Sequence, residues 1–313
     1  MKEYAFGVDI GGTTIKMGLF STKGKLLEMW EIPTRTENNG ASILADIATE
    51  VKEKMKEKQI TVDDVEGLGM GVPGPISPDG TVLKCVNLGW GIFNVEKEME
   101  KSTGLKVKAG NDANVAALGE MWQGGGKGYK DIVMVTLGTG VGGGIIINGH
   151  ILAGINGAAG EIGHIPMKEG ETECCGCGKK GCLEQYASAS VIARTANKRL
   201  AQDAAIETSL RALPEVTSKD IFDAAKSGDN FAISLVDEVG KMLGKALASI
   251  ACAVNPETFV IGGGMSKAGS ILTDSIKKYY MEYAFHAERD TEFKLAELGN
   301  YAGMFGGVKM VMG

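Results

Sequence analysis

Two segments far apart in the chain follow one pattern: an apolar run, a turn of glycine and threonine, and a second apolar run. The first is YAFGVDIGGTTIKMGLF at residues 4–20, and the second is DIVMVTLGTGVGGGIIIN at residues 131–148. Aligning Ile10-Gly11 with Leu137-Gly138 matches both turns without a gap. Each segment alone is typical of an ordinary β-hairpin. A unit used twice at a wide interval indicates two related α/β domains facing a cleft, with the hairpins as candidate phosphate-binding loops.

Standard nucleotide-binding motifs do not explain the 46 glycines, about twice the usual share. No G-x-x-x-x-G-K-[ST] sequence is present, which excludes a Walker-type loop. Gly138 to Gly143 match G-x-G-x-x-G, but residues 145–147 predict a strand where a dinucleotide fold requires a helix. A long helix is expected at about residues 231–254. The glycines at 262–264 that follow it lie between a predicted strand and a predicted helix, where the backbone can approach a flat ligand closely.

A cluster of soft ligands predicts a metal site. His164, Cys175, Cys177 and Cys182 supply one imidazole and three thiols within a glycine-rich stretch, which is a complete tetrahedral set for Zn²⁺. No coordination position would stay open, so we expect a structural ion and not one that activates water. The neighbouring Cys174 could replace Cys175 as a ligand. It could also form a redox C-x-x-C pair with Cys177, although no thioredoxin-like context surrounds it.

Composition bounds the class of protein. With 313 residues, 44% of them apolar, the chain is long enough for about two globular domains. A net charge of −6 does not favour binding to nucleic acid or to an anionic membrane. No apolar run approaches the roughly 20 residues that span a bilayer. The N-terminal sequence MKEY lacks a signal-peptide pattern, so we expect reduced thiols in the cytoplasm. Cys85 and Cys252 have apolar neighbours and are expected in the core.

Three polar clusters occur where the chain is predicted to bend. Residues 71–75 (GVPGP) predict a rigid turn, and residues 87–90 (NLGW) place an amide and an aromatic ring in a loop. Asn111 and Asp112 open a predicted helix after a strand at residues 105–109. Capping a helix is the common role of such residues. An adjacent amide and carboxylate can also bind and deprotonate a polyol, and both roles remain open at this point.

The order and spacing of these motifs resemble the ROK family of sugar kinases, in particular its bacterial ATP-dependent glucokinases, over essentially the whole chain. The motifs are DIGGTTIK at residues 9–16, PGP at 73–75, NLGW at 87–90, NDAN at 111–114, GTGVGGG at 138–144, GEIGH at 160–164, CGCGxxGCxE at 175–184 and GGG at 262–264. The resemblance implies an α/β fold of two related domains of the actin, hexokinase and heat-shock-chaperone ATPase type (ribonuclease H-like). We expect a small domain at residues 1–117 plus 302–313 and a large domain at residues 118–301.

The resemblance also implies a reaction, which is transfer of a phosphoryl group from ATP to the 6-hydroxyl of a hexose, with D-glucose expected, as in glycolysis. Asp112 would be the general base. Sugar contacts would come from Asn87, Asn111, Asp112, Glu161, His164 and Glu184. ATP contacts would come from Asp9, Gly11, Gly12, Thr13, Gly138, Thr139, Gly140, Gly262, Gly263 and Gly264. Asp9 would orient Mg²⁺ through water, and His164 would bind a structural Zn²⁺ with one nitrogen and face the sugar with the other.

Other sugars and another function class stay open as alternatives. Kinases for fructose, mannose, N-acetylglucosamine and N-acetylmannosamine share most of these motifs. ROK members also include sugar-responsive repressors with an N-terminal helix-turn-helix, for which we expect no room here because the first phosphate motif begins within ten residues of Met1. The resemblance further implies a homodimer or homotetramer, with hexose and ATP as the ligands and neither nucleic acid nor membrane as a partner.

Overall fold

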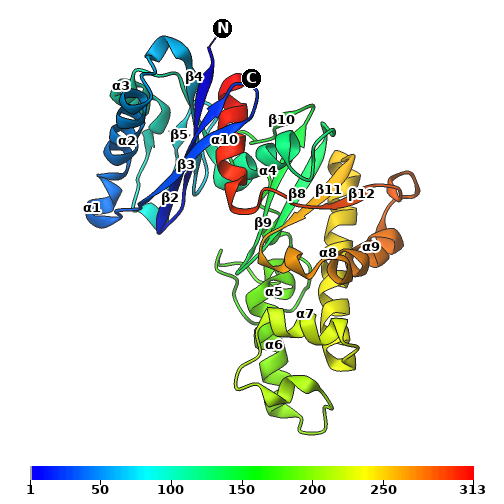
Figure 1. The fold of residues 1–313 in the computed structure, drawn as a ribbon. Coiled ribbons are helices and arrows are strands. Elements are labelled where there is room, and N and C mark those ends of the chain that lie inside the picture. The colour runs from blue at the N-terminus through cyan, green and yellow to red at the C-terminus, as the bar shows by residue number, and fades with distance from the viewer. Residues whose placement is uncertain (1) are drawn as a thin grey trace. The chain divides into compact units, whose positions relative to one another are not determined.

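The computed structural model describes residues 2–313, which form two five-stranded sheets (Figure 1). The first sheet has the strand order β3-β2-β1-β4-β7, and the second has the order β10-β9-β8-β11-β12. Numbered within its own sheet, each follows the order third, second, first, fourth, fifth. This shared order confirms the α/β fold with a duplicated sheet that the two glycine hairpins predict.

The first sheet contains the first hairpin. Its strands are β1 (Tyr4–Ile10), β2 (Thr14–Ser21), β3 (Leu26–Pro33), β4 (Val65–Val72) and β7 (Val107–Asn111). β1 runs antiparallel to β2 and parallel to β4, and β4 runs parallel to β7. Because strand side chains alternate between faces, Phe6 packs with α2 (Ile43–Glu57) and α3 (Val95–Thr103) on one face of the sheet. Ala5 packs with α10 (Ala302–Met312) on the other face (Figure 1).

Glycines let α10 lie directly on that second face. A Cβ atom built on Gly7 would lie 2.2 Å from the carbonyl oxygen of Met304, and one on Gly69 would lie 1.8 Å from that of Gly307. Real Cβ atoms do not approach so closely, so any larger residue would force the helix away from the sheet. The helix α4 (Asp112–Gln123) packs beside α10.

The second sheet contains the second hairpin. Its strands are β8 (Ile132–Leu137), β9 (Val141–Ile147), β10 (His150–Ile151), β11 (Thr258–Gly262) and β12 (Glu292–Leu295). β9 continues through residues 145–147, which confirms the sequence argument against a dinucleotide fold. The predicted long helix is α8 (Asn230–Val254), and it packs on α9 (Ser270–Tyr283) at Gly240, where a Cβ atom would lie 1.9 Å from the Oγ atom of Ser275.

Four further helices and a two-stranded sheet complete the regular structure of residues 2–313. The helices are α1 (Glu37–Gly40), α5 (Glu184–Ala187), α6 (Ala189–Gln202) and α7 (Ser218–Lys226), and β5 (Thr81–Val82) pairs with β6 (Phe93–Asn94). Single 3₁₀ turns occur at Val62–Asp64, Val86–Leu88, Ile162–His164, Ser209–Ala212, Gly264–Ala268, His286–Glu288 and Gly299–Tyr301. Thr217 caps α7 in a capping box with Asp220.

By packing, the chain divides into two compact units. Unit 1 comprises the residues up to Ile132, Gly144–Gly160 and Glu297–Gly313, and unit 2 comprises Val133–Gly143 and Glu161–Ala296. The expected division at residues 117 and 302 stays a prediction, because compactness does not define which segments move together. Between residues 2 and 313, no helix has both the length and the apolar character needed to cross a membrane.

One prediction about the core is wrong. Cys85 is buried as expected, but Cys252 is exposed, with its Sγ atom 3.6 Å from an Oε atom of Glu288. The apolar neighbours of Cys252 suggested burial. The 3.6-residue period of α8, however, turns the preceding Ile250 and Ala251 to the core and Cys252 to the surface.

Candidate active site

In unit 1, the sheet brings two carboxylates together. Asp9 lies near the end of β1 and Asp112 is the first residue of α4, directly after β7, with β4 between the two strands. A Cβ atom on Gly71 of β4 would lie 3.4 Å from Asp9 Oδ1 and 3.6 Å from the Cα atom of Asp112. A Cβ atom on Gly303 of α10 would lie 2.5 Å from Asp9 Cγ. Gly303, which sequence reasoning missed, makes the space for the Asp9 carboxylate, whereas a Cβ atom on Gly71 would be in ordinary van der Waals contact.

The surroundings of Asp9 disfavour its negative charge. Burial raises the pKa of Asp9 to about 6, the charge of Asp112 adds to the rise, and Lys16, opposite Asp9 on β2, counteracts it. Two neighbouring carboxylates with one charge poorly compensated form a donor set that suits a hard divalent cation such as Mg²⁺. The acids therefore fit the expected Mg²⁺ role of Asp9.

Asn111 does cap the helix that Asp112 opens. Its Oδ1 atom accepts hydrogen bonds from the backbone N–H groups of Ala113 (3.1 Å) and Asn114 (3.2 Å). Its Nδ2 atom donates to the carbonyl oxygen of Gly74 at 3.2 Å, and no other residue among 2–313 accepts from that amide. The Asp112 carboxylate accepts from Ala113 N–H at 2.8 Å. Capping and ligand binding are thus compatible, because the cap holds the amide in place and leaves one N–H for a ligand.

The loop that contains Asn87 lies beside these residues. Asn87 is exposed in the 3₁₀ turn Val86–Leu88, and a Cβ atom on Gly74 would lie 3.6 Å from the Cα atom of Cys85. Burial raises the pKa of the Cys85 thiol, and the charge of Asp112 adds to the rise, which places the loop within electrostatic reach of that acid. Unit 1 therefore gathers Asp9, Asn111, Asp112 and the Asn87 loop in one region.

The first hairpin turn is held by a residue that sequence reasoning missed. The Thr34 Oγ1 donates to the carbonyl oxygen of Gly11 at 2.7 Å, and its N–H donates to that of Thr13 at 2.9 Å. A Cβ atom on Gly12 would meet no atom within 4 Å, so this side of the turn is open. Thr34 follows β3, and only the pairing of β3 with β2 brings it to the turn.

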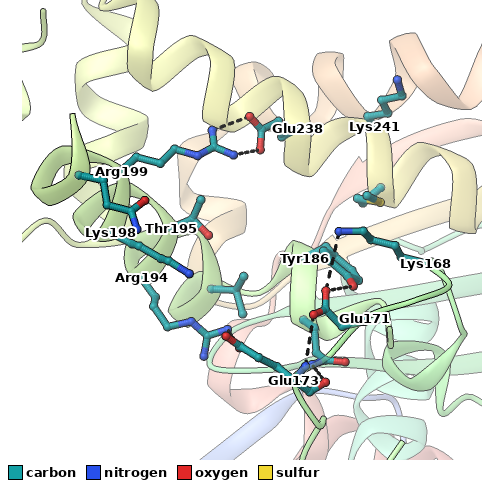
Figure 2. A pocket seen from close by; sticks show the side chains of 14 residues that line it. Lys168, Glu171, Glu173, Tyr186, Arg194, Thr195, Lys198, Arg199, Glu238 and Lys241 are labelled. Atoms are coloured by element: carbon teal, nitrogen blue, oxygen red, sulfur yellow. Dashed lines mark hydrogen bonds and ion pairs between the residues drawn. The ribbon is translucent and has the colours of Figure 1, made fainter. Parts of the chain in front are cut away.

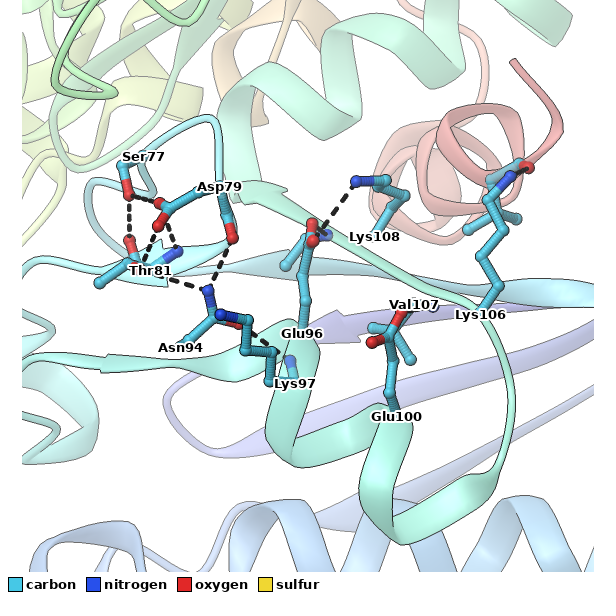
Figure 3. Close-up of polar contacts among 12 residues, drawn as sticks. Ser77, Asp79, Thr81, Asn94, Glu96, Lys97, Glu100, Lys106, Val107 and Lys108 are labelled. Atoms are coloured by element: carbon cyan, nitrogen blue, oxygen red, sulfur yellow. Dashed lines mark hydrogen bonds and ion pairs between the residues drawn. The ribbon is translucent and has the colours of Figure 1, made fainter.

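A polar network supports the strand that leads to Asp112 (Figure 3). Glu96, buried at the start of α3, accepts a hydrogen bond from the N–H of Ala109 at 2.8 Å and lies 3.4 Å from the Lys108 Nζ. Asp79 accepts from Thr81 Oγ1 at 3.0 Å in the loop before β5. The network fixes the position of β7, which ends at Asn111.

In unit 2, the second hairpin and the third glycine block lie side by side. Gly263 has a φ angle of 82°, and a Cβ atom there would lie 2.5 Å from the carbonyl oxygen of Leu137, which directly precedes Gly138. The hairpin turn is held from α6, because the Gly138 carbonyl accepts from Ala189 N–H at 2.8 Å and the Thr139 carbonyl accepts from Ser190 Oγ at 2.5 Å. Two of the three predicted nucleotide segments are thus adjacent within one unit.

The four predicted metal ligands converge. The ligand atoms of His164, Cys175, Cys177 and Cys182 all lie within 4.8 Å of one another. Cys177 and Cys182 have their Sγ atoms 3.6 Å apart, and Cys175 Sγ lies 3.7 Å from His164 Nδ1. Tetrahedral Zn²⁺ with the usual bond lengths requires separations of about 3.6 to 3.8 Å, so the donor set fits this ion. Cys174 is exposed and outside the group, which excludes it from this ligand set.

The predicted sugar-binding acids flank this cluster. Glu184 Oε1 lies 2.7 Å from Cys175 Sγ and 3.8 Å from His164 Nδ1, and Glu161 Oε2 lies 3.9 Å from His164 Nε2. A Cβ atom on Gly140 would lie 2.8 Å from Glu184 Oε2. The second hairpin, the metal ligands and the acids of unit 2 therefore form one connected structure.

Unit 2 also has a cavity of about 580 Å³ that none of these residues line, between residues 168–173, α6 and α8 (Figure 2). Its charges are largely paired within the protein. Arg199 forms a bidentate ion pair with Glu238, and Glu171, whose pKa falls to about 2, accepts a hydrogen bond from Tyr186 at 2.7 Å. The cavity contains none of the residues singled out from sequence.

Known proteins resemble the chain along almost its full length. The ROK family profile matches residues 5–313. A glucokinase from Halalkalibacterium halodurans is 46% identical over 96% of this chain and 92% of the relative. The crystal structure of a ROK family glucokinase from Streptomyces griseus, in complex with glucose and AMPPNP, superposes with a TM-score of 0.75 at 34% identity over 98% of both chains. A ROK family transcriptional regulator, a homologue of the E. coli MLC protein, superposes with a TM-score of 0.87 at 27% identity, over 99% of this chain and 77% of the regulator.

Fold similarity alone does not separate kinases from regulators, since both kinds of protein superpose well. The family profile, however, matches residues 5–313, and this range includes both sheets and the Cys₃His group. This chain belongs to the ROK family.

Proposed function

We propose that the protein transfers the γ-phosphoryl group of ATP to the 6-hydroxyl of D-glucose. The observation that supports this most directly is the position of Asp112, at the first turn of α4, beside Asp9, Asn111 and the Asn87 loop. Such a site offers a base, a carboxylate partner for a cation and amide groups for sugar hydroxyls. The 46% identity to a glucokinase supports glucose over the other hexoses.

Asp112 acts as the general base in this proposal. Its carboxylate takes the proton of the 6-hydroxyl while the oxygen attacks the γ-phosphorus, the bond to the ADP oxygen breaks, and the proton later leaves Asp112 for solvent. Its hydrogen bond from Ala113 N–H holds the carboxylate at the start of α4. Asn111 and Asn87 donate hydrogen bonds that orient the sugar.

The glycine turns bind the nucleotide in this proposal. Backbone N–H groups and the hydroxyls of Thr13 and Thr139 contact phosphate oxygens, and residues 262–264 lie against the adenosine. When bound, Mg²⁺ would neutralise phosphate charge, and Asp9 would orient it through water. The packing of Gly263 against Leu137 supports a shared nucleotide surface within unit 2.

A structural Zn²⁺ held by His164, Cys175, Cys177 and Cys182 completes the proposal. With Nδ1 of His164 toward the thiols, Nε2 faces Glu161, so both can meet sugar hydroxyls. Glu184 touches both the thiol side and the second hairpin. We also include a homodimer or homotetramer and a cytoplasmic location, which sedimentation and cell fractionation would test.

A coupled assay of ADP release tests the reaction. The purified protein is given ATP with glucose, mannose, fructose, N-acetylglucosamine or N-acetylmannosamine, or no sugar. We expect strict dependence on hexose and the highest kcat/KM for glucose. A higher kcat/KM for another sugar would replace the substrate, and binding of sugar without any phosphorylation would favour a regulatory protein.

A further inference from the structure

Glu120 is a buried acid that the reaction does not use. It lies in the last turns of α4, has no exposed surface, and has no Lys, Arg or His partner among residues 2–313. A buried carboxylate without a counter-ion is costly unless hydrogen bonds compensate its charge. Its partners therefore indicate why the chain keeps an acid at this position.

Three backbone amides from two separate segments surround this carboxylate. Oε2 accepts hydrogen bonds from Gly125 N–H at 2.9 Å and Glu297 N–H at 3.0 Å, and Oε1 accepts from Leu298 N–H at 2.8 Å. A carboxylate only accepts hydrogen bonds, so it suits three donors better than an amide or a hydroxyl would. The side chain thus ties the end of α4 to the segment that leads into α10.

The tied helices are those that position the acid pair. α4 begins with Asp112, and α10 contains Gly303, which lies against the Asp9 carboxylate. The two helices pack at close range, since a Cβ atom on Gly119 would lie 2.1 Å from the carbonyl oxygen of Ala302. A shift of α10 along α4 would move Gly303 past Asp9 and change the distance between Asp9 and Asp112.

From these contacts we infer that Glu120 is a positioning residue for the reaction, because its carboxylate fixes the register of α10 on α4 and thereby the arrangement of Asp9 and Asp112. This inference rests on the proposed kinase function. A residue with a purely structural role would affect only the stability of the protein. A positioning role for Glu120 predicts that its variants catalyse the reaction more slowly even when they are folded.

Two variants disturb the carboxylate in different ways. Glu120→Gln keeps the shape but turns an NH₂ group toward an N–H donor. Gly124→Ala keeps the acid and displaces it, since the new Cβ would lie 2.0 Å from Glu120 Oε2. The matched control is Glu288→Gln, which changes another buried glutamate, in unit 2 and remote from the acid pair in sequence.

The test measures kcat, glucose KM and the Mg²⁺ concentration for half-maximal rate well below the melting temperature of each variant. We expect both unit 1 variants to lower kcat about 10- to 100-fold, as small misplacements of catalytic groups do, to require more Mg²⁺, and to change glucose KM by less than about threefold. Glu288→Gln should lose stability with unchanged kinetics. Affinity for the Mn²⁺ complex of a non-hydrolysable ATP analogue, measured by calorimetry, should fall in the same two variants.

Several results would overturn the inference. One is a lower melting temperature of Glu120→Gln and Gly124→Ala while kcat and the Mg²⁺ dependence stay at wild-type values. Another is the failure of both variants to fold. Either result would assign Glu120 to folding alone. A wild-type protein inactive on every hexose would contradict the proposed function instead. The calorimetric comparison would then decide the role of Glu120 by itself.

Discussion

The two glycine hairpins occupy the same place in two sheets of the same strand order, but they are supported differently. In the first sheet, β3 is eight residues long and places Thr34 on the turn at Gly11 and Thr13. In the second, the equivalent strand β10 has two residues, and α6 supplies Ala189 and Ser190 to the turn instead. The second hairpin is therefore joined to the α5 and α6 segment that contains Glu184, next to the Cys₃His group, whereas the first is supported by its own sheet.

The two hairpins also differ in the charge they present. Aligned by their turns, Asp9 of the first corresponds to Thr136 of the second. The first sheet gathers carboxylates, which suit proton transfer and cations, and the second presents hydroxyl and N–H groups, which suit phosphate oxygens. The two hairpins are therefore expected to differ in role, and four predictions test this difference.

The largest effect should follow from Asp112→Asn. The amide cannot accept the proton of the 6-hydroxyl, so we expect kcat to fall about 10²- to 10⁴-fold. Glucose binding, measured by calorimetry, should change little because the amide keeps its shape and its hydrogen bond from Ala113. The exposed Asp63 provides the control, Asp63→Asn. Near-normal turnover in Asp112→Asn would remove Asp112 as the base and the first sheet as the site of proton transfer.

Asp9→Asn should lower activity and raise stability. The folded-state pKa of about 6 lies above the usual 3.8, so the folded protein holds a proton that the unfolded chain has lost between these values. The contribution of Asp9 to the free energy of unfolding is therefore most favourable below about pH 4, and up to about 3 kcal/mol of it is lost as the pH rises through 6.

The measurement is denaturant unfolding at several pH values in buffer without Mg²⁺. Asp9→Asn should be more stable than wild type at pH 7.5, and the difference should shrink toward about pH 4. The same variant should lose about 10- to 100-fold in kcat, because a small disturbance of the catalytic arrangement has such effects. Equal stability of the two proteins at every pH would contradict an environment that disfavours the Asp9 charge.

Local patterns allowed part of this site to be predicted. The hairpins, the Gly263 turn and the Cys₃His ligands are each encoded within about 20 residues, so spacing alone identifies them. The approach of Asp9 to Asp112 depends on β4 lying between β1 and β7, and the roles of Thr34 and Gly303 depend on pairing and packing between distant segments. Cys252 was wrongly predicted to be buried because its apolar neighbours were taken as evidence of burial. The 3.6-residue period of α8 would have placed Cys252 on the exposed side of the helix.

Disruption of the Cys₃His group should affect unit 2 more than unit 1. Cys182→Ser removes a buried ligand, and loss of a structural ion should lower the melting temperature by roughly 10 °C and raise glucose KM several-fold through Glu161, His164 and Glu184. Atomic absorption measures the zinc content, calorimetry measures the melting temperature, and steady-state kinetics measure the glucose KM. Cys174→Ser is the matched control, since Cys174 is exposed and outside the ligand set. A metal-free protein with unchanged glucose KM would contradict the link between metal and sugar.

The smallest effect should follow from Thr136→Val, the counterpart of Asp9→Asn. Thr136 bears no charge, and its Oγ1 lies against the backbone of Gly142, where a Cβ atom would be 2.6 Å away, so its role is packing beneath the second hairpin. Valine has nearly the same shape, and we expect kcat and the KM for ATP to change by less than about threefold, with a stability loss of about 1 kcal/mol for the hydroxyl. Steady-state kinetics at varied ATP, run beside Asp9→Asn, measure the contrast. Asp9 and Thr136 hold equivalent positions in the two hairpins but differ in charge. If Thr136→Val lowered kcat as much as Asp9→Asn does, the position in the hairpin and not the charge would matter, and the proposed difference between the hairpins would be wrong.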